Sequence, residues 1–156
     1  MLNWLKSRLS GPKPAGPPQV LRAFAPGTPT ITQGGIRAEQ GAWRIDATAE
    51  QSIRLFEVDN PAVDQCLLTY RAELKAEGLK GRAFLEMWCR LPGRGEFFSK
   101  GIHQAISGTV NWARSEIPFY LKSGQKPDLI KLNLAVEGMG TVWLRNIELL
   151  KTPLAS

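Results

Sequence analysis

The run QCLLTYRAELKAEGLKGRAFLEMWCR, residues 65–90, decides the fold expected of this chain. Apolar and polar residues alternate on both sides of its glycine-containing centre, Glu77–Gly81, as is typical of strands with one buried face. The apolar positions are Cys66, Leu68, Tyr70, Ala72 and Leu74 in the first half and Ala83, Leu85, Met87 and Cys89 in the second. The run therefore predicts a β-hairpin with Leu74 opposite Ala83. This register also gives two favourable cross-strand pairs, Arg71 with Glu86 and Thr69 with Trp88.

Shorter runs with the same alternation predict further strands. They cover Val20–Ala25, Phe97–Ser107, Arg114–Leu121, Leu129–Val136 and Thr141–Leu150. Turns are expected where glycine recurs, at Gly108–Thr109, Ser123–Gly124 and Gly138–Gly140. Because no stretch after Gly11 shows a helical period, the sequence predicts an all-β, antiparallel sandwich.

Three motifs near the C-terminus resemble a known family. They are ISGTVNW at 106–112, IPF at 117–119 and GMGTVWLRNIEL at 138–149. Together they resemble the closing half of the galactose-binding-like jelly roll found in several carbohydrate-binding module families, and the resemblance covers roughly the last third of the chain. It implies an antiparallel jelly-roll β-sandwich, which we expect to occupy residues 20–156.

The resemblance also implies a bulge at Arg145–Asn146 in the last strand. The bulge resets the alternation, so that Ile147 and Leu149 face inward like the apolar residues before it. In related modules the two residues at the bulge are often aspartates, and one of them helps to bind a structural calcium ion. Arg145 disfavours a cation at this place, and no metal ion or other cofactor is expected.

The N-terminal segment differs in composition from the rest of the chain. Residues 1–10 can form a short amphipathic helix, and residues 11–19 form a stiff proline-rich linker. Residues 1–38 contain five basic residues and no acidic one, whereas the remaining 15 basic and 14 acidic residues nearly cancel. This distribution suits an anionic surface better than a nucleic-acid groove, and nucleic acid is not expected as a partner.

The N-terminal residues are therefore candidates for attachment to a protein partner or to an anionic membrane surface. The candidate anchoring residues are Leu2, Trp4, Leu5, Lys6, Arg8, Leu9 and Lys13. A helix of this length forms only on a surface that holds it, and the alternative, a frayed terminus, stays equally open. The chain shows neither a signal peptide nor a transmembrane segment, so we expect a cytoplasmic protein that can lie peripherally at the membrane.

A second candidate site lies on the polar face of the predicted hairpin. Phe84 and Trp88 are expected to form an exposed aromatic platform, bordered by charged residues that could hydrogen-bond to a sugar ring or to a partner's loop. The candidate residues are Arg71, Arg82, Phe84, Glu86, Trp88 and Arg90. The alternative, that another segment of the chain covers this face, stays open with equal weight.

No residue pattern indicates catalysis, so no catalytic residue is predicted. His103 is the only histidine, and the sequence contains no nucleophile-elbow, zinc-protease or paired acidic motif. The remaining notable residues are expected to be structural: His103 in a strand, Cys66 and Cys89 as buried free thiols, and Trp43, Trp112 and Trp143 in the framework.

These features predict a non-catalytic binding or scaffold module. The main hypothesis is an accessory subunit that docks on a larger, membrane-associated protein assembly through its basic N-terminal arm and its sandwich surface. The alternative is a carbohydrate-binding module that uses the platform of Phe84 and Trp88. Galactose-binding-like jelly rolls serve both purposes, so the fold alone does not decide between them.

Overall fold

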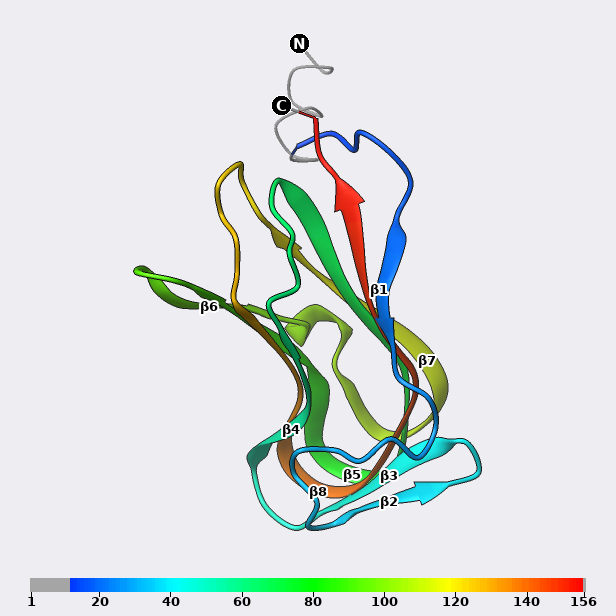
Figure 1. Cartoon of the computed structure of the whole chain (residues 1–156). Coiled ribbons are helices and arrows are strands. Elements are labelled where there is room, and N and C mark those ends of the chain that lie inside the picture. Colours follow the sequence, from blue (N-terminus) through cyan, green and yellow to red (C-terminus); the bar gives the residue numbers. More distant parts are fainter. Residues whose placement is uncertain (1–11, 156) are drawn as a thin grey trace.

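The computed structural model describes residues 12–155, which form eight strands and one short 3₁₀ helix (Figure 1). The strands are β1 (Gln19–Ala23), β2 (Ile36–Glu39), β3 (Ala42–Ala47), β4 (Gln51–Asp59), β5 (Cys66–Leu91), β6 (Gly95–Lys100), β7 (Ile106–Tyr120) and β8 (Leu129–Pro153). The helix η1 (Ile102–Gln104) connects β6 to β7. The helix predicted for residues 1–10 lies outside the described residues.

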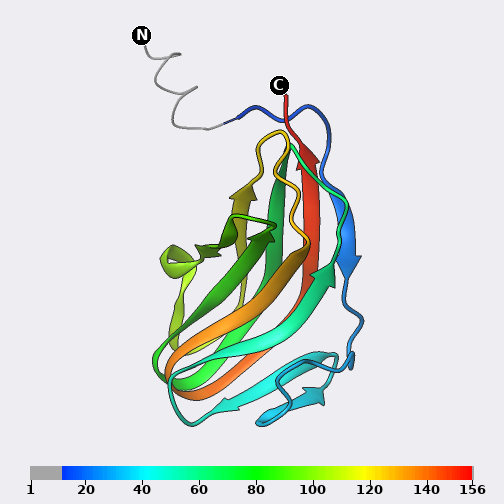
Figure 2. The same cartoon turned by 60° about the vertical axis from the view of Figure 1, so that its left-hand side comes forward.

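The two longest strands, β5 and β8, pair with each other from end to end. Cys66 at the start of β5 lies beside Pro153 at the end of β8, and Arg90 lies beside Leu129. Both strands bend sharply near their middles, at 78–81 and 138–140 (Figures 1 and 2). The eight-stranded sheet is thereby folded over on itself.

The bend divides the sheet into two facing layers. In the β4 layer, residues 82–91 of β5 and 129–137 of β8 are flanked by β6 and β4. In the β7 layer, residues 66–77 of β5 and 140–153 of β8 are flanked by β7 on one side and by β1 and β3 on the other. β2 pairs with β3. The inward side chains of both layers form one apolar core, so the expected all-β sandwich is confirmed.

Glycine is required at the bend because the two strands cross there too closely for side chains. A Cβ on Gly81 would overlap the carbonyl oxygen of Glu137, and a Cβ on Gly138 would overlap the carbonyl oxygen of Lys80. Both glycines also have positive φ, +97° and +150°, which L side chains rarely adopt. These glycines therefore mark a bend within each strand.

The predicted hairpin is wrong. The two halves of β5 lie in different layers, and each pairs with a different half of β8. Arg71 consequently lies opposite Glu148, and Glu86 lies opposite Asn133. A strand that folds over a core alternates in the same way as a hairpin, because each half buries every second residue. The buried positions were therefore predicted correctly, whereas the partner of each half of the strand was not.

Several predicted boundaries also differ from the structure. The strand predicted for Phe97–Ser107 is split, and His103 lies in η1 and not in a strand. The turns expected at Gly108–Thr109 and Gly138–Gly140 lie within β7 and β8, whereas the turn at Ser123–Gly124 is confirmed. The long strands contain irregularities at these glycines, where the register with β5 shifts.

The core residues expected from the alternation are buried. Cys66 and Cys89 are buried free thiols as predicted, although they lie in different layers and not on adjacent strands. Burial raises the pKa of Cys66 to about 11 and that of Cys89 to about 12, so both thiols stay protonated at neutral pH. The Tyr70 hydroxyl is fully buried and donates to the carbonyl oxygen of Asn133 (3.2 Å).

The bulge predicted in the last strand is confirmed. Glu73 pairs with Arg145 and Arg71 pairs with Glu148, so β8 contains one extra residue at this place. Asn146 has a φ of +55°, a conformation that asparagine tolerates better than most residues.

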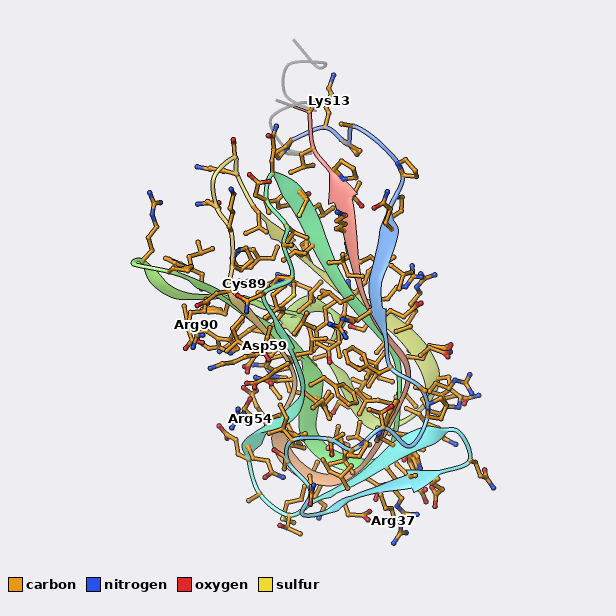
Figure 3. The ribbon with its side chains drawn as sticks, in the orientation of Figure 1. Lys13, Arg37, Arg54, Asp59, Cys89 and Arg90 are labelled. Carbon is orange, nitrogen blue, oxygen red and sulfur yellow. The ribbon has the colours of Figure 1, made fainter. Side chains whose placement is uncertain are left out.

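Residues from the predicted linker lie against the C-terminal end of β8. The Ala15 N–H donates to the carbonyl oxygen of Pro153 (2.7 Å), and the Ala155 N–H donates to that of Lys13 (2.9 Å). Figure 3 shows Lys13 at the opposite end of the molecule from Arg37 of β2. Lys13, the one candidate anchoring residue in the described range, is exposed. Between residues 12 and 155, no helix is long and apolar enough to cross a membrane.

Candidate functional site

The outward face of the β4 layer brings together polar and aromatic side chains from four strands. The strand register places them in three rows that cross the sheet. The rows are Ser52, Ala135 and Phe84; Arg54, Asn133, Glu86 and Lys100; and Glu57, Lys131, Trp88 and Phe98. We call these residues the β4 face.

Glu86 lies at the centre of the β4 face and is 6% exposed. Its Oε1 accepts three hydrogen bonds, from the Ser52 hydroxyl (2.8 Å), the Trp88 indole N–H (3.0 Å) and the Asn133 side-chain amide (3.1 Å). Its Oε2 lies 3.8 Å from Lys100 Nζ, beyond direct hydrogen-bond distance. One oxygen of the carboxylate is thus saturated, and the other retains capacity to accept.

The charge of Glu86 is stabilised by this network. Burial alone would raise the pKa of its carboxyl group, because desolvation disfavours the anion. The hydrogen bonds from Asn133, Trp88 and Ser52, with the charge of Lys100, outweigh burial and lower the pKa below its ordinary value. Glu86 is therefore an anion at neutral pH and acts as a hydrogen-bond acceptor.

An aromatic pair borders Glu86 on the side of β6. The rings of Trp88 and Phe98 lie 5.2 Å apart with their planes inclined by 54°. Phe98 is 52% exposed, whereas Trp88 is half-buried and its indole N–H donates to Glu86. Lys100 Nζ lies 4.7 Å from the centre of the Phe98 ring. The pair offers an apolar surface in which the hydrogen bond to Glu86 fixes the orientation of the Trp88 ring.

The β4 face is hollowed beside this pair. An open depression of ≈ 410 Å³ is lined by Ser52, Arg54, Glu86, Trp88, Glu96, Lys131 and Asn133. A second depression of ≈ 250 Å³ also contains Ser52 and Glu86 in its lining. Together they make a shallow, open hollow over the middle of the sheet.

The charges of the β4 face are balanced by ion pairs. Arg54 pairs with Glu57 (2.9 Å), and Lys131 pairs with Glu96 (2.8 Å). At one end of the sheet, Arg90 pairs with Asp128 (2.8 Å). Figure 3 shows Arg54 and Arg90 on the same side of the molecule. The hollow therefore carries little net charge.

The outward face of the β7 layer also contains tryptophans, and cations lie close to their rings, as Lys100 does to Phe98 on the β4 face. The Arg145 guanidinium lies 4.0 Å from the centre of the Trp112 ring, and Lys75 Nζ lies 5.0 Å from that of Trp143. The Trp143 indole N–H donates to Glu39 (2.6 Å). The predicted framework role suits these residues and also Trp43, which is 3% exposed.

The structure separates the predicted binding residues into two groups. Arg82, Glu86, Trp88 and Arg90 share one side of the β4 layer because they alternate along a single strand. Arg71 does not belong with them, since it lies in the β7 layer and pairs with Glu148 (2.8 Å).

Phe84 also differs from its prediction. It lies on the predicted side of the strand but is 2% exposed, with the Arg82 guanidinium 5.4 Å from the centre of its ring. The prediction that Phe84 forms half of an exposed platform is wrong, and Phe98 takes this place beside Trp88.

Several residues of the β4 face were not predicted. Ser52, Phe98, Lys100 and Asn133 come from β4, β6 and β8, and only the pairing of these strands with β5 places them beside Glu86. The alternation of Glu96, Phe98 and Lys100 was visible in the sequence as a possible polar face. The sequence did not show which strand pairs with this one.

The residues at the β8 bulge do not fit a calcium ion. Glu73 supplies the carboxylate there, and its Oε1 already accepts from the Arg145 guanidinium (2.9 Å) and the Asn146 amide (2.5 Å). These hydrogen bonds, the first from Arg145, keep the pKa of Glu73 below its ordinary value. Calcium requires several oxygen ligands, whereas a cationic side chain occupies this place. Within the described range, no group of three or more His, Cys, Asp and Glu residues could hold a metal ion.

The fold is shared with solved carbohydrate-binding modules. The CBM22-1 xylan-binding domain from Paenibacillus barcinonensis Xyn10C aligns with a TM-score of 0.61 at 13% identity, over 90% of this chain and 99% of that one. The CBM22-1–GH10 modules of the Clostridium thermocellum endo-1,4-beta-D-xylanase 10B, complexed with xylohexaose, align with a TM-score of 0.54 at 7% identity, over 84% and 28% of the two chains. A mutant of a family 29 carbohydrate-binding module aligns with a TM-score of 0.52 at 14% identity, over 88% and 92%.

The chain therefore shares the β-sandwich fold of these modules, which agrees with the galactose-binding-like jelly roll that the sequence predicted. The likeness covers most of the chain and is not confined to its C-terminal third. No protein-family model and no curated protein matches the chain. At identities this low the likeness establishes the fold alone.

Proposed function

We propose that this chain is a non-catalytic carbohydrate-binding module whose β4 face holds a neutral polysaccharide. The observation that carries this proposal is the pairing of a buried, fixed carboxylate, Glu86, with an aromatic pair, the half-buried Trp88 and the exposed Phe98. Sugar recognition needs both, because the ring carbons pack on aromatic surfaces and the hydroxyl groups bind oriented polar groups.

The size and the charge of the β4 face support a chain-like, uncharged ligand. Its rows cross four strands, and three strand spacings of about 4.8 Å give a length of about 14 Å, enough for a short stretch of polysaccharide. The ion pairs of Arg54 and Lys131 leave no large excess of either charge for an acidic or basic polymer. Two of the structural neighbours are named for binding xylan or were solved with xylohexaose.

Polar groups for hydroxyl recognition are already in place. The free oxygen of Glu86 can accept from a sugar hydroxyl, and Lys100 and Arg54 can donate to others. Because Glu86 is held by three donors, little reorganisation is needed when the sugar binds.

The test is binding to a panel of soluble neutral polysaccharides, including xylan, mixed-linkage glucan and mannan, measured by affinity electrophoresis and calorimetry. Trp88→Ala and Phe98→Ala should each weaken binding about tenfold, which corresponds to about 1.4 kcal/mol. Trp112→Ala is the matched control, since Trp112 lies on the outward face of the other layer, and it should bind as the intact protein does. If the intact protein binds none of these polymers, the proposal is wrong.

Docking on a larger membrane-associated assembly remains a separate prediction. It depends chiefly on residues 1–10, which lie outside the described residues. Carbohydrate binding is favoured because the β4 face offers defined contacts for a sugar and because the solved structures that share the fold are carbohydrate-binding modules.

A further inference from the structure

A pocket lined by positive charge lies where the turn between β5 and β6 meets the loop between β7 and β8. It has a volume of ≈ 570 Å³. Its lining residues are Leu91, Pro92, Arg94, Lys122, Ser123, Gly124, Gln125 and Lys126, and we call it the basic pocket. No carboxylate is among these described lining residues, although Asp64 Oδ2 accepts a hydrogen bond from the N–H of one of them, Gly124 (3.2 Å).

The cations of the basic pocket differ from those of the β4 face. Arg54, Lys100 and Lys131 all lie within ion-pair distance of carboxylates. The three basic side chains of the pocket form no ion pair with any residue of the range 12–155. Three like charges around one space repel one another, and an anion in that space would relieve the repulsion.

Hydrogen bonds hold the loops that carry these cations. The Lys122 N–H donates to Gln125 Oε1 (2.7 Å), and the Gln125 N–H donates to the carbonyl oxygen of Lys122 (3.0 Å). The Asp128 N–H donates to the carbonyl oxygen of Arg90 (3.0 Å), which joins this loop to the end of β5. A site whose backbone is already held loses less conformational entropy when a ligand binds.

We propose that the basic pocket is a second binding site, for a small molecule or chain end that carries an oxyanion, such as a carboxylate, sulfate or phosphate group. Arg94 can donate two parallel N–H groups to such an anion, while Lys122 and Lys126 act as point charges. The pocket is larger than one oxyanion requires, so the Ser123 hydroxyl and the side-chain NH₂ group of Gln125 remain available to other polar groups of the ligand. This site goes beyond the proposed function, because a neutral polysaccharide on the β4 face does not need it.

The test uses the full chain and three probes, glucuronate, inorganic sulfate and inorganic phosphate, with glucose as the neutral counterpart. Saturable binding of at least one anion, but not of glucose, is expected by NMR titration and should weaken as salt is added. The double variant Lys122→Gln, Lys126→Gln should weaken this binding about tenfold or more, because it removes two charge-assisted contacts. Arg94→Gln should weaken it independently. The tightest of the three probes identifies the chemistry of the anion.

A control double variant, Arg37→Gln with Lys80→Gln, removes the same charge from exposed basic residues outside the pocket and should leave anion binding unchanged. Trp88→Ala should weaken polysaccharide binding but leave anion binding unchanged, so the two proposals can fail separately. If none of the three anions binds saturably, or if both double variants weaken binding equally, the basic pocket is not a site. Circular dichroism of each variant checks that the fold is retained.

Discussion

A buried carboxylate needs hydrogen-bond donors, and Glu86 receives them from three strands. Ser52 lies on β4, Asn133 on β8 and Trp88 on β5 itself. The same contacts that make Glu86 an acceptor for a ligand therefore also hold the β4 layer together. Removing the carboxylate should affect both binding and stability.

Glu86 should make the stability of the protein depend on pH. Its pKa is lower in the folded protein than its ordinary value of 4.5, so its contribution is present above pH 4.5 and is lost as pH falls through the folded pKa. Urea unfolding between pH 7 and pH 3 should show a steeper loss of stability in the natural chain than in Glu86→Gln. At pH 7, Glu86→Ala should destabilise by about 2 kcal/mol, because it leaves buried donors without an acceptor. Equal pH slopes for the natural chain and Glu86→Gln would contradict this account.

Arg145 lies at the bulge where the family resemblance implied a metal site, and its removal should lower the stability of the protein. Arg145→Ala should destabilise the protein by about 1 kcal/mol, since it removes the hydrogen bond to Glu73 and the contact with Trp112. The melting temperature of the natural chain should be the same in calcium chloride and in a chelator. A melting temperature that falls with chelator would show that a cation binds in spite of Arg145.

At the scale of the elements, β5 and β8 determine the architecture because each contributes to both layers. Their bends need glycine for two reasons. The glycines have positive φ, and the two backbones lie so close together there that a Cβ would overlap the other strand. In this fold the two longest strands, and not separate hairpins, connect the layers.

A substitution at the bend should therefore lower the free energy of unfolding more than a substitution at an ordinary glycine turn. Gly81→Ala should destabilise by about 3 kcal/mol or more, or prevent folding, because its Cβ overlaps the backbone of Glu137. Gly27→Ala is the control: it has a similar φ of +85° but open space around it, and should cost about 1–2 kcal/mol. Chemical denaturation of both variants measures the difference. Similar losses of stability in the two variants would mean that the backbones of β5 and β8 can move apart at the bend.

At the scale of the whole molecule, the two ends of the described range lie together. The backbone bonds of Lys13 and Ala15 to residues 153–155 fix the start of the domain beside the end of β8. The proposed division into residues 1–10, 11–19 and 20–156 is still to be tested, and these bonds identify the deletions that test it.

Deleting residues 1–11 should leave the melting temperature and polysaccharide binding unchanged, because the bonds to β8 remain. Deleting residues 1–18 should lower the melting temperature by about 2–4 °C, the shift expected for a loss of about 1 kcal/mol in a domain of about 150 residues. If the N-terminal residues anchor the protein, the shorter deletion should also abolish co-sedimentation with anionic vesicles. Co-sedimentation that persists without residues 1–11 would contradict the anchoring prediction.

Local alternation was sufficient to predict the strand class and the inward positions, because these depend on neighbours within one strand, whereas the β8 bulge was predicted from the family resemblance. The alternation also placed Arg82, Glu86, Trp88 and Arg90 on one face for the same reason. Only the tertiary structure decided that β5 bends instead of forming a hairpin, since both arrangements bury the same residues. The pairing of β5 with β4, β6 and β8 then moved Arg71 to the other layer and brought Phe98 and Asn133 to Glu86. Such pairing is set by contacts between residues distant in the chain, which the alternation of one strand does not specify.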